Sequence, residues 1–247
     1  TGTKDVNTPG VKDETEDPED EKELIPKDAS SYRGMVARAN YMGQDRSDIQ
    51  FAFKELSRTM SRPTVGSWKA LKRLGRYLID KTRVIVKFAY QESVNEIVVW
   101  TDSDYAGCRK TRKSTSGGVV MLGSHMVKSW ATMQGVIALS SGEAEYYGIV
   151  KGTSVALGLR NMLDDLGMKV KIEVKTDASA AKGIASRRGA GKVRHIEVSQ
   201  LWVQDKVAAG EVVLQKVGTY DNIADALTKN VTNDILQKHM VLTSQAV

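Results

Sequence analysis

The sequence contains few of the residues that build disulfide, zinc or membrane proteins. Its single cysteine, Cys108, cannot form an internal disulfide, which fits a reducing compartment. Its three histidines lack the spacing of a zinc site. There is no run of eighteen apolar residues and no secretory leader, so we expect an intracellular protein with no membrane partner. The chain begins with Thr rather than Met, and we therefore expect it to be part of a longer protein.

Charge is distributed unevenly along the chain. Residues 1–28 carry ten acidic residues and four lysines, a net charge of −6 in a chain whose total is +6. This segment also holds three of the four prolines and few large apolar side chains, so it cannot bury enough surface to offset the entropy of ordering. We predict a disordered acidic tail. The remaining residues carry +12, which suits a polyanionic partner, although a solvated surface would explain the charge equally well.

The segment 29–90 is predicted to be mainly helical. Ser47 is placed to cap one helix that ends before Pro63, and Thr64 is placed to cap the next. Lysines and arginines on the second helix indicate a solvated face or, alternatively, a helix that contacts phosphates. Residues 83–90 are rich in Val, Ile and aromatic side chains, a pattern typical of a strand.

From residue 91 onward the pattern predicts a mixed α/β domain, to which we assign residues 91–240, with 241–247 as a C-terminal tail. Strands are expected at 96–102, 115–122, 125–132, 169–176 and 211–217, and helices at 141–166, 178–186, 195–208 and from about 222. A hairpin turn at Gly123-Ser124 would join the second and third strands. Three antiparallel strands followed by alternating helices and strands are typical of an α/β domain.

Four acidic residues fall where a metal-dependent nuclease would need them. Asp102 and Asp177 end predicted strands, Glu145 opens the long helix, and Asp225 lies in a late helix. Mg²⁺ is usually held by a few carboxylates together with substrate phosphate. Paired ions about 3.5–4 Å apart stabilise both the attacking and the leaving oxygen of a phosphodiester. The combination of the four acids therefore predicts a two-metal site.

Each acid also has an ordinary structural alternative. Asp102 could open a turn, and Asp104 has the same strand parity and is a rival for the same role. Asp177 could cap the helix that follows it. Asp225 could form an ion pair with Lys229, four residues further along a helix.

Helical periodicity separates Glu145 from its neighbour Glu143. The apolar stripe of the long helix consists of Ile149, Gly152, Ala156, Leu159, Leu163 and Leu166. Extended backward by four residues, this stripe reaches Glu145, which we expect to face the sheet. Glu143 lies about 200° round the helix from Glu145. We expect Glu143 to be more exposed, near the positive end of the helix dipole.

Five sequence motifs follow one another between residues 96 and 230. They are Trp100-Thr101-Asp102-Ser103-Asp104-Tyr105-Ala106-Gly107 with Ser114-Thr115-Ser116-Gly117-Gly118, Ala138-Leu139-Ser140-Ser141-Gly142-Glu143-Ala144-Glu145-Tyr146, Lys175-Thr176-Asp177 with Ala180-Ala181, Arg194-His195-Ile196, and Ala224-Asp225-Ala226-Leu227-Thr228-Lys229. Together they resemble the RNase H domain of copia-type retrotransposons. Upstream, stretches between residues 32 and 78 are similar to the end of the same element's reverse transcriptase. The polymerase's Tyr-x-Asp-Asp motif is missing, so DNA synthesis by this chain is not expected.

The resemblance implies an RNase H-like α/β fold, a five-stranded mixed sheet flanked by helices and preceded by a small helical thumb- or connection-like region. It implies hydrolysis of the RNA strand of an RNA–DNA hybrid with two Mg²⁺ or Mn²⁺ ions. Asp102, Glu145, Asp177 and Asp225 match the family's metal ligands, which favours Asp102 over Asp104. The implied partners are the hybrid and the upstream reverse-transcriptase region of the same polyprotein. The implied location is a cytoplasmic virus-like particle, or the nucleus.

Two basic segments are candidates for hybrid contacts. The expected nucleic-acid-binding residues are Arg109, Lys110, Arg187, Arg188, Lys192 and Arg194. The stretch at 109–113 could equally serve only to solubilise a hairpin loop. Cellular RNases H place a histidine in a loop before the last acid, and here the loop at 218–222 has none. His195 could act instead, or could simply be a packed or capping residue.

Two other functions are compatible with the sequence. One is a strand-transfer enzyme of the same fold, although the helix-borne Glu145 early in the domain argues against it. The other is a catalytically inactive RNase H-like module that binds nucleic acid or has a structural role in a decayed retroelement. The presence of all four acids favours an enzyme.

Overall fold

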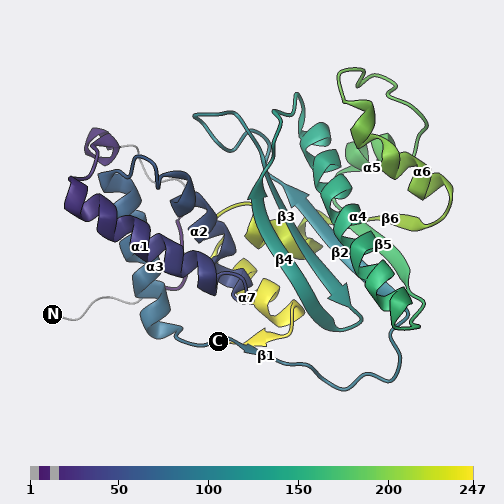
Figure 1. Ribbon diagram of the computed structural model, residues 1–247, viewed down its shortest axis with the longest axis horizontal. Coiled ribbons are helices and arrows are strands. Elements are labelled where there is room, and N and C mark those ends of the chain that lie inside the picture. Colours follow the sequence, from purple (N-terminus) through teal and green to yellow (C-terminus); the bar gives the residue numbers. More distant parts are fainter. Residues whose placement is uncertain (1–5, 12–16, 247) are drawn as a thin grey trace. The chain divides into compact units, whose positions relative to one another are not determined.

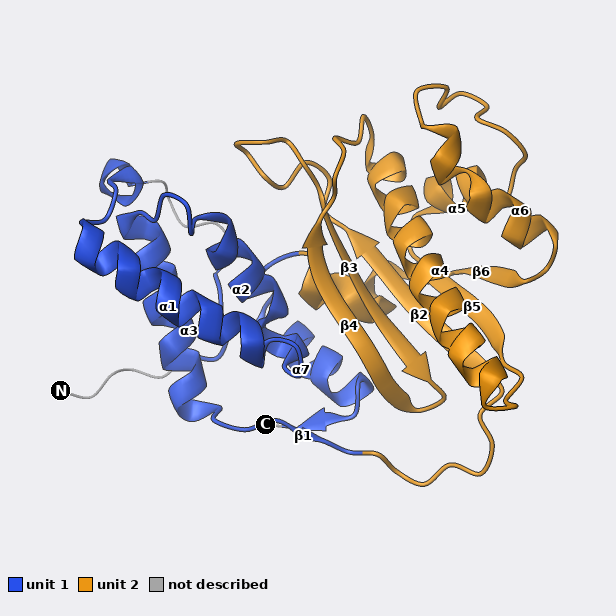
Figure 2. Cartoon of the chain, in the orientation of Figure 1, with its two compact units in different colours: residues 1–87, 229–247 blue, residues 88–228 orange. Residues whose placement is uncertain are grey.

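The computed structural model describes residues 6–11 and 17–246, which form two compact units. Unit 1 comprises residues 1–87 and 229–247, and unit 2 comprises residues 88–228 (Figure 2). Unit 1 is thus assembled from both ends of the chain, whereas unit 2 is one continuous segment. Among the described residues, no helix combines the length and the apolar character that crossing a bilayer requires.

Unit 1 consists mainly of helices. Its elements are the 3₁₀ helix η1 (Pro18–Glu21), the helices α1 (Pro26–Met42), α2 (Ser47–Arg58), α3 (Val65–Asp80) and α7 (Asn233–Leu242), and the short strands β1 (Ile85–Val86) and β7 (Gln245–Ala246) (Figure 1). Thr64 caps α3 as predicted, because its hydroxyl accepts from the Ser67 N–H while the Ser67 hydroxyl accepts from the Thr64 N–H. Ser47 is not a cap, and instead lies inside the first turn of α2.

Buried polar residues join α2 to α3 and to the C-terminal segment. The Arg46 guanidinium donates two hydrogen bonds to Asp48, and the Tyr77 hydroxyl donates to the same carboxylate at 2.8 Å. Burial, followed by the neighbouring Asp48 charge, raises the pKa of Tyr77 well above its usual value. The Ser47 hydroxyl lies 2.8 Å from His239 Nε2 and donates to Gln245 Oε1 at 2.6 Å. The C-terminal segment is therefore part of the core of unit 1.

Three sequence predictions need correction in unit 1. The acidic segment 1–28 lies partly outside the described residues, but beyond residue 17 it is ordered: η1 forms, Glu23 bridges to Thr64, and α1 begins at Pro26. Ion pairs with basic residues elsewhere in unit 1 help to offset the entropy of ordering this segment, and composition does not reveal such pairs. One of them joins Lys69 to Asp20 at 2.6 Å. The segment 83–90 forms only the two-residue strand β1, whose partner is β7. Residues 241–246 are therefore not a loose tail.

Unit 2 contains the predicted five-stranded sheet. Its elements are β2 (Glu96–Ser103), β3 (Thr115–Leu122), β4 (His125–Met133), α4 (Ser141–Asp165), β5 (Lys171–Thr176), α5 (Ser179–Ala185), α6 (Trp202–Ala208) and β6 (Val212–Lys216), with 3₁₀ helices η2 (Val198–Gln200), η3 (Thr219–Asp221) and η4 (Ile223–Leu227). The strand order is β4-β3-β2-β5-β6. The pairs β4–β3 and β3–β2 are antiparallel, whereas β2–β5 and β5–β6 are parallel. The expected mixed α/β sheet flanked by helices is confirmed.

The two faces of β2 are covered by different elements. On one face α4 approaches so closely that a Cβ at Gly152 would lie 2.7 Å from the Thr101 methyl carbon. On the other face lies η4, since a Cβ at Gly117, the partner of Asp102 on β3, would lie 2.7 Å from the Thr228 methyl carbon. Alternate residues of a strand point to opposite faces. The end of β2 is therefore enclosed between α4 and η4.

Candidate metal centre

Asp102 is a buried charge at the end of the central strand. It is the last but one residue of β2 and is only 4% exposed. The Thr228 hydroxyl, just after η4, donates a hydrogen bond to Asp102 Oδ2. Asp102 is thus part of the strand ladder rather than the opening of a turn, and a neutral donor orients its carboxylate.

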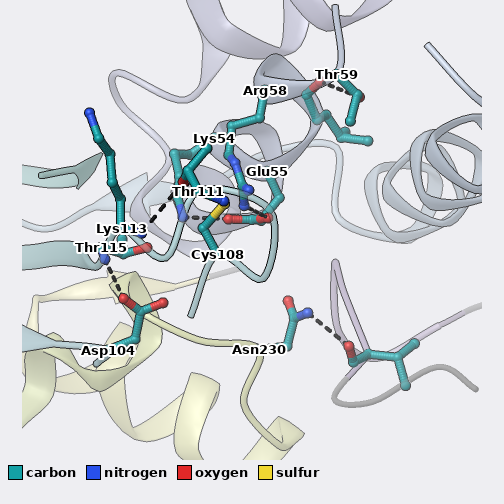
Figure 3. A network of polar contacts seen from close by, with 12 residues as sticks. Lys54, Glu55, Arg58, Thr59, Asp104, Cys108, Thr111, Lys113, Thr115 and Asn230 are labelled. Carbon is teal, nitrogen blue, oxygen red and sulfur yellow. Dashed lines mark hydrogen bonds and ion pairs between the residues drawn. The ribbon is translucent and has the colours of Figure 1, made fainter. Parts of the chain in front are cut away.

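Asp104, the rival for the same role, is used in the backbone pairing. Its carboxylate accepts a hydrogen bond from the Thr115 N–H, and its own N–H donates to the Thr115 carbonyl at 3.1 Å (Figure 3). Both contacts close the ladder between β2 and β3 where the strands separate. Asp104 is not a member of the carboxylate group described below.

Glu145 projects from the second turn of α4 toward the end of β2. Ser140 caps α4, since its hydroxyl accepts from the Glu143 N–H at 3.2 Å. The Ser103 N–H donates to Glu145 Oε1 at 3.1 Å, which joins the helix directly to the residue after Asp102. Glu145 is 8% exposed.

Asp177 is brought to the same place by the parallel pairing of β5 with β2. Trp100 is opposite Lys175 in this ladder, and the Thr101 hydroxyl donates to the Lys175 carbonyl at 3.2 Å. Parallel strands end at the same edge of a sheet, so Asp177, the residue after β5, lies beside the end of β2. The N-cap position of α5 is Ala178, so Asp177 does not cap that helix.

The structure brings three of the four predicted acids together. One carboxylate oxygen each from Asp102, Glu145 and Asp177 lies within 4.8 Å of the others. Oxygen ligands are what Mg²⁺ and Mn²⁺ prefer, and like charges this close repel one another unless a cation lies between them. The donor set therefore fits a hard divalent cation.

Asp225 lies in η4, at the same end of β2, but it is not in the group of three. The Thr228 hydroxyl that binds Asp102 also lies 3.2 Å from the Asp225 carbonyl oxygen. The Asn222 side chain donates to the Thr101 carbonyl at 2.9 Å, which fixes the start of η4 to β2. The structure thus places the Asp225 backbone beside the group, and its role as a fourth ligand stays a prediction.

Glu143 differs from the sequence prediction, because it is buried rather than exposed. It is 1% exposed, and it accepts hydrogen bonds from the Leu139 N–H at 2.9 Å, the Tyr147 hydroxyl at 2.9 Å and His195 Nε2 at 2.7 Å. Burial opposes the charge, but the bond from His195 and then those from Leu139 and Tyr147 outweigh it and hold the pKa of Glu143 below its usual value. His195 is thus a partner of Glu143. The segment just before α4 and the loop that carries His195 cover the face of α4 that helical periodicity assigned to solvent.

Five of the six candidate nucleic-acid-binding residues are exposed to solvent, and one is not. Arg109, Lys110, Arg188, Lys192 and Arg194 are exposed. Arg187 is half-buried and donates to the Ala190 carbonyl at 2.5 Å, so it closes its own loop. The first basic segment is held by Cys108, which is buried and accepts from the Thr111 hydroxyl at 2.8 Å (Figure 3). Cys108 therefore has a structural role.

Residues without a charge supply contacts that the sequence analysis missed. Thr228, Ser103 and Asn222 hold Asp102, Glu145 and η4 through the hydrogen bonds given above. The only available signal was their position within or beside the motifs. A hydrogen bond from Thr228 to an acid 126 residues away has no local sequence signature.

Comparison with known proteins finds homologues among transposon polyproteins. The chain is 28% identical over 213 residues to the retrovirus-related Pol polyprotein from transposon RE2 of Arabidopsis thaliana, which covers 85% of this chain and 15% of that protein. It is 29% identical over 188 residues to the Pol polyprotein from transposon TNT 1-94 of Nicotiana tabacum, covering 75% of this chain and 14% of that protein. The chain is a homologue of retrovirus-related Pol polyproteins of plant transposons. It spans about one seventh of the length of these transposon Pol polyproteins. No protein-family model matches it.

Among solved structures, this chain is similar to an N-terminal RNase H domain from Mycobacterium tuberculosis, determined as a fusion with maltose-binding protein. The identity is 22%, the TM-score is 0.41, and the match covers 60% of this chain and 98% of the other. Because this TM-score is below 0.5, the fold assignment rests on the sheet itself, with its order β4-β3-β2-β5-β6 and its helices.

Proposed function

We propose that this chain carries a retroelement ribonuclease H, a metal-dependent endonuclease that hydrolyses the RNA strand of RNA–DNA hybrids. The observation that supports the proposal most strongly is the group formed by Asp102, Glu145 and Asp177. These acids come from two strand ends and a helix, and one carboxylate oxygen of each lies within 4.8 Å of the others. Asp102 and Glu145 are buried and Asp177 is half-buried. Charges of one sign this close together and this far out of water are costly unless a cation lies between them, so the group is typical of a cation site.

The proposed ligands are Asp102, Glu145 and Asp177, with Asp225 as the fourth. When bound, two Mg²⁺ or Mn²⁺ ions would supply an activated water and offset charge on the departing 3′ oxygen. The chain's own residues orient the ligands: the Thr228 hydroxyl holds one oxygen of Asp102, and the Ser103 N–H holds one oxygen of Glu145. In Asp102 and in Glu145, one carboxylate oxygen is held by a hydrogen bond, and this fixes the direction in which the other oxygen points.

The proposed substrate contacts are the exposed basic residues of the two loops. Arg109 and Lys110 form one set, and Arg188, Lys192 and Arg194 form the other. Lysine and arginine side chains bind phosphates of the nucleic-acid backbone without reading sequence. Selection of the RNA strand would come from contacts with the 2′-hydroxyl in the wide minor groove.

The test is cleavage of a labelled RNA–DNA hybrid with and without Mg²⁺. We expect Asp102→Asn and Asp177→Asn to lose cleavage by at least about 10²-fold while they still bind the hybrid, because a positioned metal supplies several kcal/mol of transition-state stabilisation. Asp104→Asn is the matched control, since an Asn oxygen can still accept from the Thr115 N–H. Asp225→Asn tests the fourth ligand in the same assay.

Mg²⁺-dependent cleavage by Asp102→Asn at the wild-type rate would contradict the assignment and point to Asp104. Hybrid binding by the wild-type chain with no cleavage in Mg²⁺ or Mn²⁺ would favour an inactive nucleic-acid-binding module.

A further inference from the structure

Gln134 lies between the elements that carry Asp102 and Glu145, although no motif singled it out. It is the first residue after β4, and its N–H donates to the Ser114 carbonyl at 2.8 Å. Its side chain is buried, at 8% exposed. Nε2 lies 2.8 Å from Ser116 Oγ, 2.8 Å from the Ala144 carbonyl oxygen and 3.2 Å from Ser103 Oγ.

Each acceptor of the Gln134 amide is next to the metal centre. Ala144 immediately precedes Glu145, Ser103 immediately follows Asp102, and Ser116 is opposite Ser103 in the β2–β3 ladder. An amide NH₂ group has two hydrogens, so the two shorter contacts take them and Ser103 shares one. One side chain thus joins the first turn of α4 to the ends of β2 and β3.

We propose that Gln134 is a positioning residue for the metal centre. By holding the carbonyl of Ala144 and the hydroxyl of Ser116 together, it fixes the start of α4 relative to the end of β2, which sets the separation of the Glu145 and Asp102 carboxylates. The Ser103 N–H that binds Glu145 belongs to the same connection. The inference rests on the proposed function of the carboxylate group, and it assigns to Gln134 the role of an outer residue that orients metal ligands.

The other end of the amide argues against a purely stabilising role. Gln134 Oε1 is buried and makes no hydrogen bond to any of the residues that the structure describes. A buried acceptor without a partner costs stability, which offsets part of what the Nε2 bonds contribute. Turning the amide round would place Oε1 against the Ala144 carbonyl oxygen, and two acceptors repel one another. The Gln134 amide is therefore held in the orientation in which Nε2 donates to the Ala144 carbonyl at the start of α4, although its Oε1 has no hydrogen-bond donor among the described residues.

The test compares Gln134→Met with Gln204→Met in the full chain. Methionine keeps the length of the side chain and removes its amide. Gln204 is the matched control because it is also buried, at 5% exposed, and its amide makes three hydrogen bonds, to the Ile184 carbonyl and to both backbone groups of Gly189. Mn²⁺ binding is measured by titration calorimetry, folding by thermal unfolding, and kcat and KM for the hybrid as functions of Mn²⁺ concentration.

We expect Gln134→Met to fold and to bind Mn²⁺ roughly 10–100-fold more weakly, the usual effect of losing an outer partner of metal ligands. Its kcat should recover at high Mn²⁺ while KM for the hybrid is unchanged. Gln204→Met should bind Mn²⁺ as the wild type does, whatever stability it loses.

A folded Gln134→Met chain with wild-type Mn²⁺ affinity would overturn the inference. If Gln134→Met does not fold, Ser116→Ala, which removes one acceptor, replaces it, and unchanged Mn²⁺ affinity in that variant would overturn the inference as well. Mn²⁺ binding by the Asp177→Asn variant with the wild-type affinity would instead refute the proposed metal site itself. The two failures are therefore distinguishable.

Discussion

At the scale of single residues, neutral donors orient two of the three carboxylates in the group. Asp102 accepts from the Thr228 hydroxyl, and Glu145 accepts from the Ser103 N–H. A neutral donor fixes one oxygen of a carboxylate without cancelling its charge, so the attraction for a cation is retained. A mutation that removes a neutral donor should therefore change the orientation of a carboxylate ligand while leaving its negative charge in place.

Thr228→Val should weaken metal binding without removing a ligand. Valine has nearly the shape of threonine but cannot donate to Asp102, so we expect the Mn²⁺ affinity to fall roughly 10–100-fold. Thr228→Ser keeps the hydroxyl and should stay within a few-fold of the wild type. Calorimetric titration of both variants checks this, and equal affinities for the two would show that the hydroxyl does not orient Asp102.

At the scale of elements, the position of Glu145 depends on how closely α4 approaches β2. A Cβ at Gly152 would lie 2.7 Å from the Thr101 methyl carbon and 3.0 Å from a Val99 methyl carbon, and both side chains are fully buried. Close packing leaves such neighbours little room to move. The absence of a side chain at Gly152 is thus a condition for the helix-to-strand distance on which the carboxylate group depends.

Gly152→Ala should destabilise the protein and slow cleavage. Overpacking of a buried contact typically costs about 1–3 kcal/mol. Gly158→Ala is the matched control in the same helix, because nothing lies within 4 Å of its Cβ position and alanine favours a helix by about 0.5–1 kcal/mol over glycine. Chemical denaturation of the two variants measures the difference, and a Gly152→Ala chain as stable as Gly158→Ala would contradict the close approach.

The basic loop between α5 and α6 is a second element whose function can be separated from its structure. Arg188 and Lys192 are exposed, whereas Arg187 is occupied with the Ala190 carbonyl. Replacing Arg188 and Lys192 with Ala should reduce the slope of log affinity for the hybrid against log salt by about one to two, since about 0.9 counterions are released per phosphate contact. Filter binding over a salt series checks this. An unchanged slope would exclude these two residues as phosphate contacts.

At the scale of the whole molecule, the C-terminal segment completes a unit that the N-terminal segment begins. Residues 229–247 supply α7 and β7, which contact α2 and β1 through His239, Gln245 and the β1–β7 pairing. Unit 2 lies between these two segments in the sequence and contains its own sheet and core. Unit 1 therefore needs both ends of the chain, whereas unit 2 does not.

Residues 1–87 expressed alone should have incomplete tertiary structure and should gain it when a peptide of residues 229–247 is added. The Ser47 hydroxyl and the exposed edge of β1 would otherwise lack their partners. Near-ultraviolet circular dichroism and hydrogen exchange of the fragment, with and without the peptide, measure this. A peptide with Leu in place of His239 is the control, and full structure in the fragment alone would contradict the prediction.

The sequence by itself determined the elements whose cause is local. The period of Ile172 and Val174 gives β5, the apolar run of β2 places Asp102 near a strand end, and the left-handed Gly167, at φ +77°, follows the end of α4. Together with the order of the motifs, these patterns sufficed for the α/β fold and for naming three acids that converge.

Only the tertiary structure decided which side chains surround those acids. Glu143 is buried because residues near 139 and 195 cover it, and helical periodicity contains no information about such cover. Strand parity did not separate Asp104 from Asp102, and the resemblance favoured Asp102 without a physical reason. The structure supplies the reason, because Asp104 accepts from the Thr115 N–H whereas Asp102 joins the carboxylate group. Gln134 and Thr228 act through partners distant in sequence, and a contact of that kind exists only once the chain has folded.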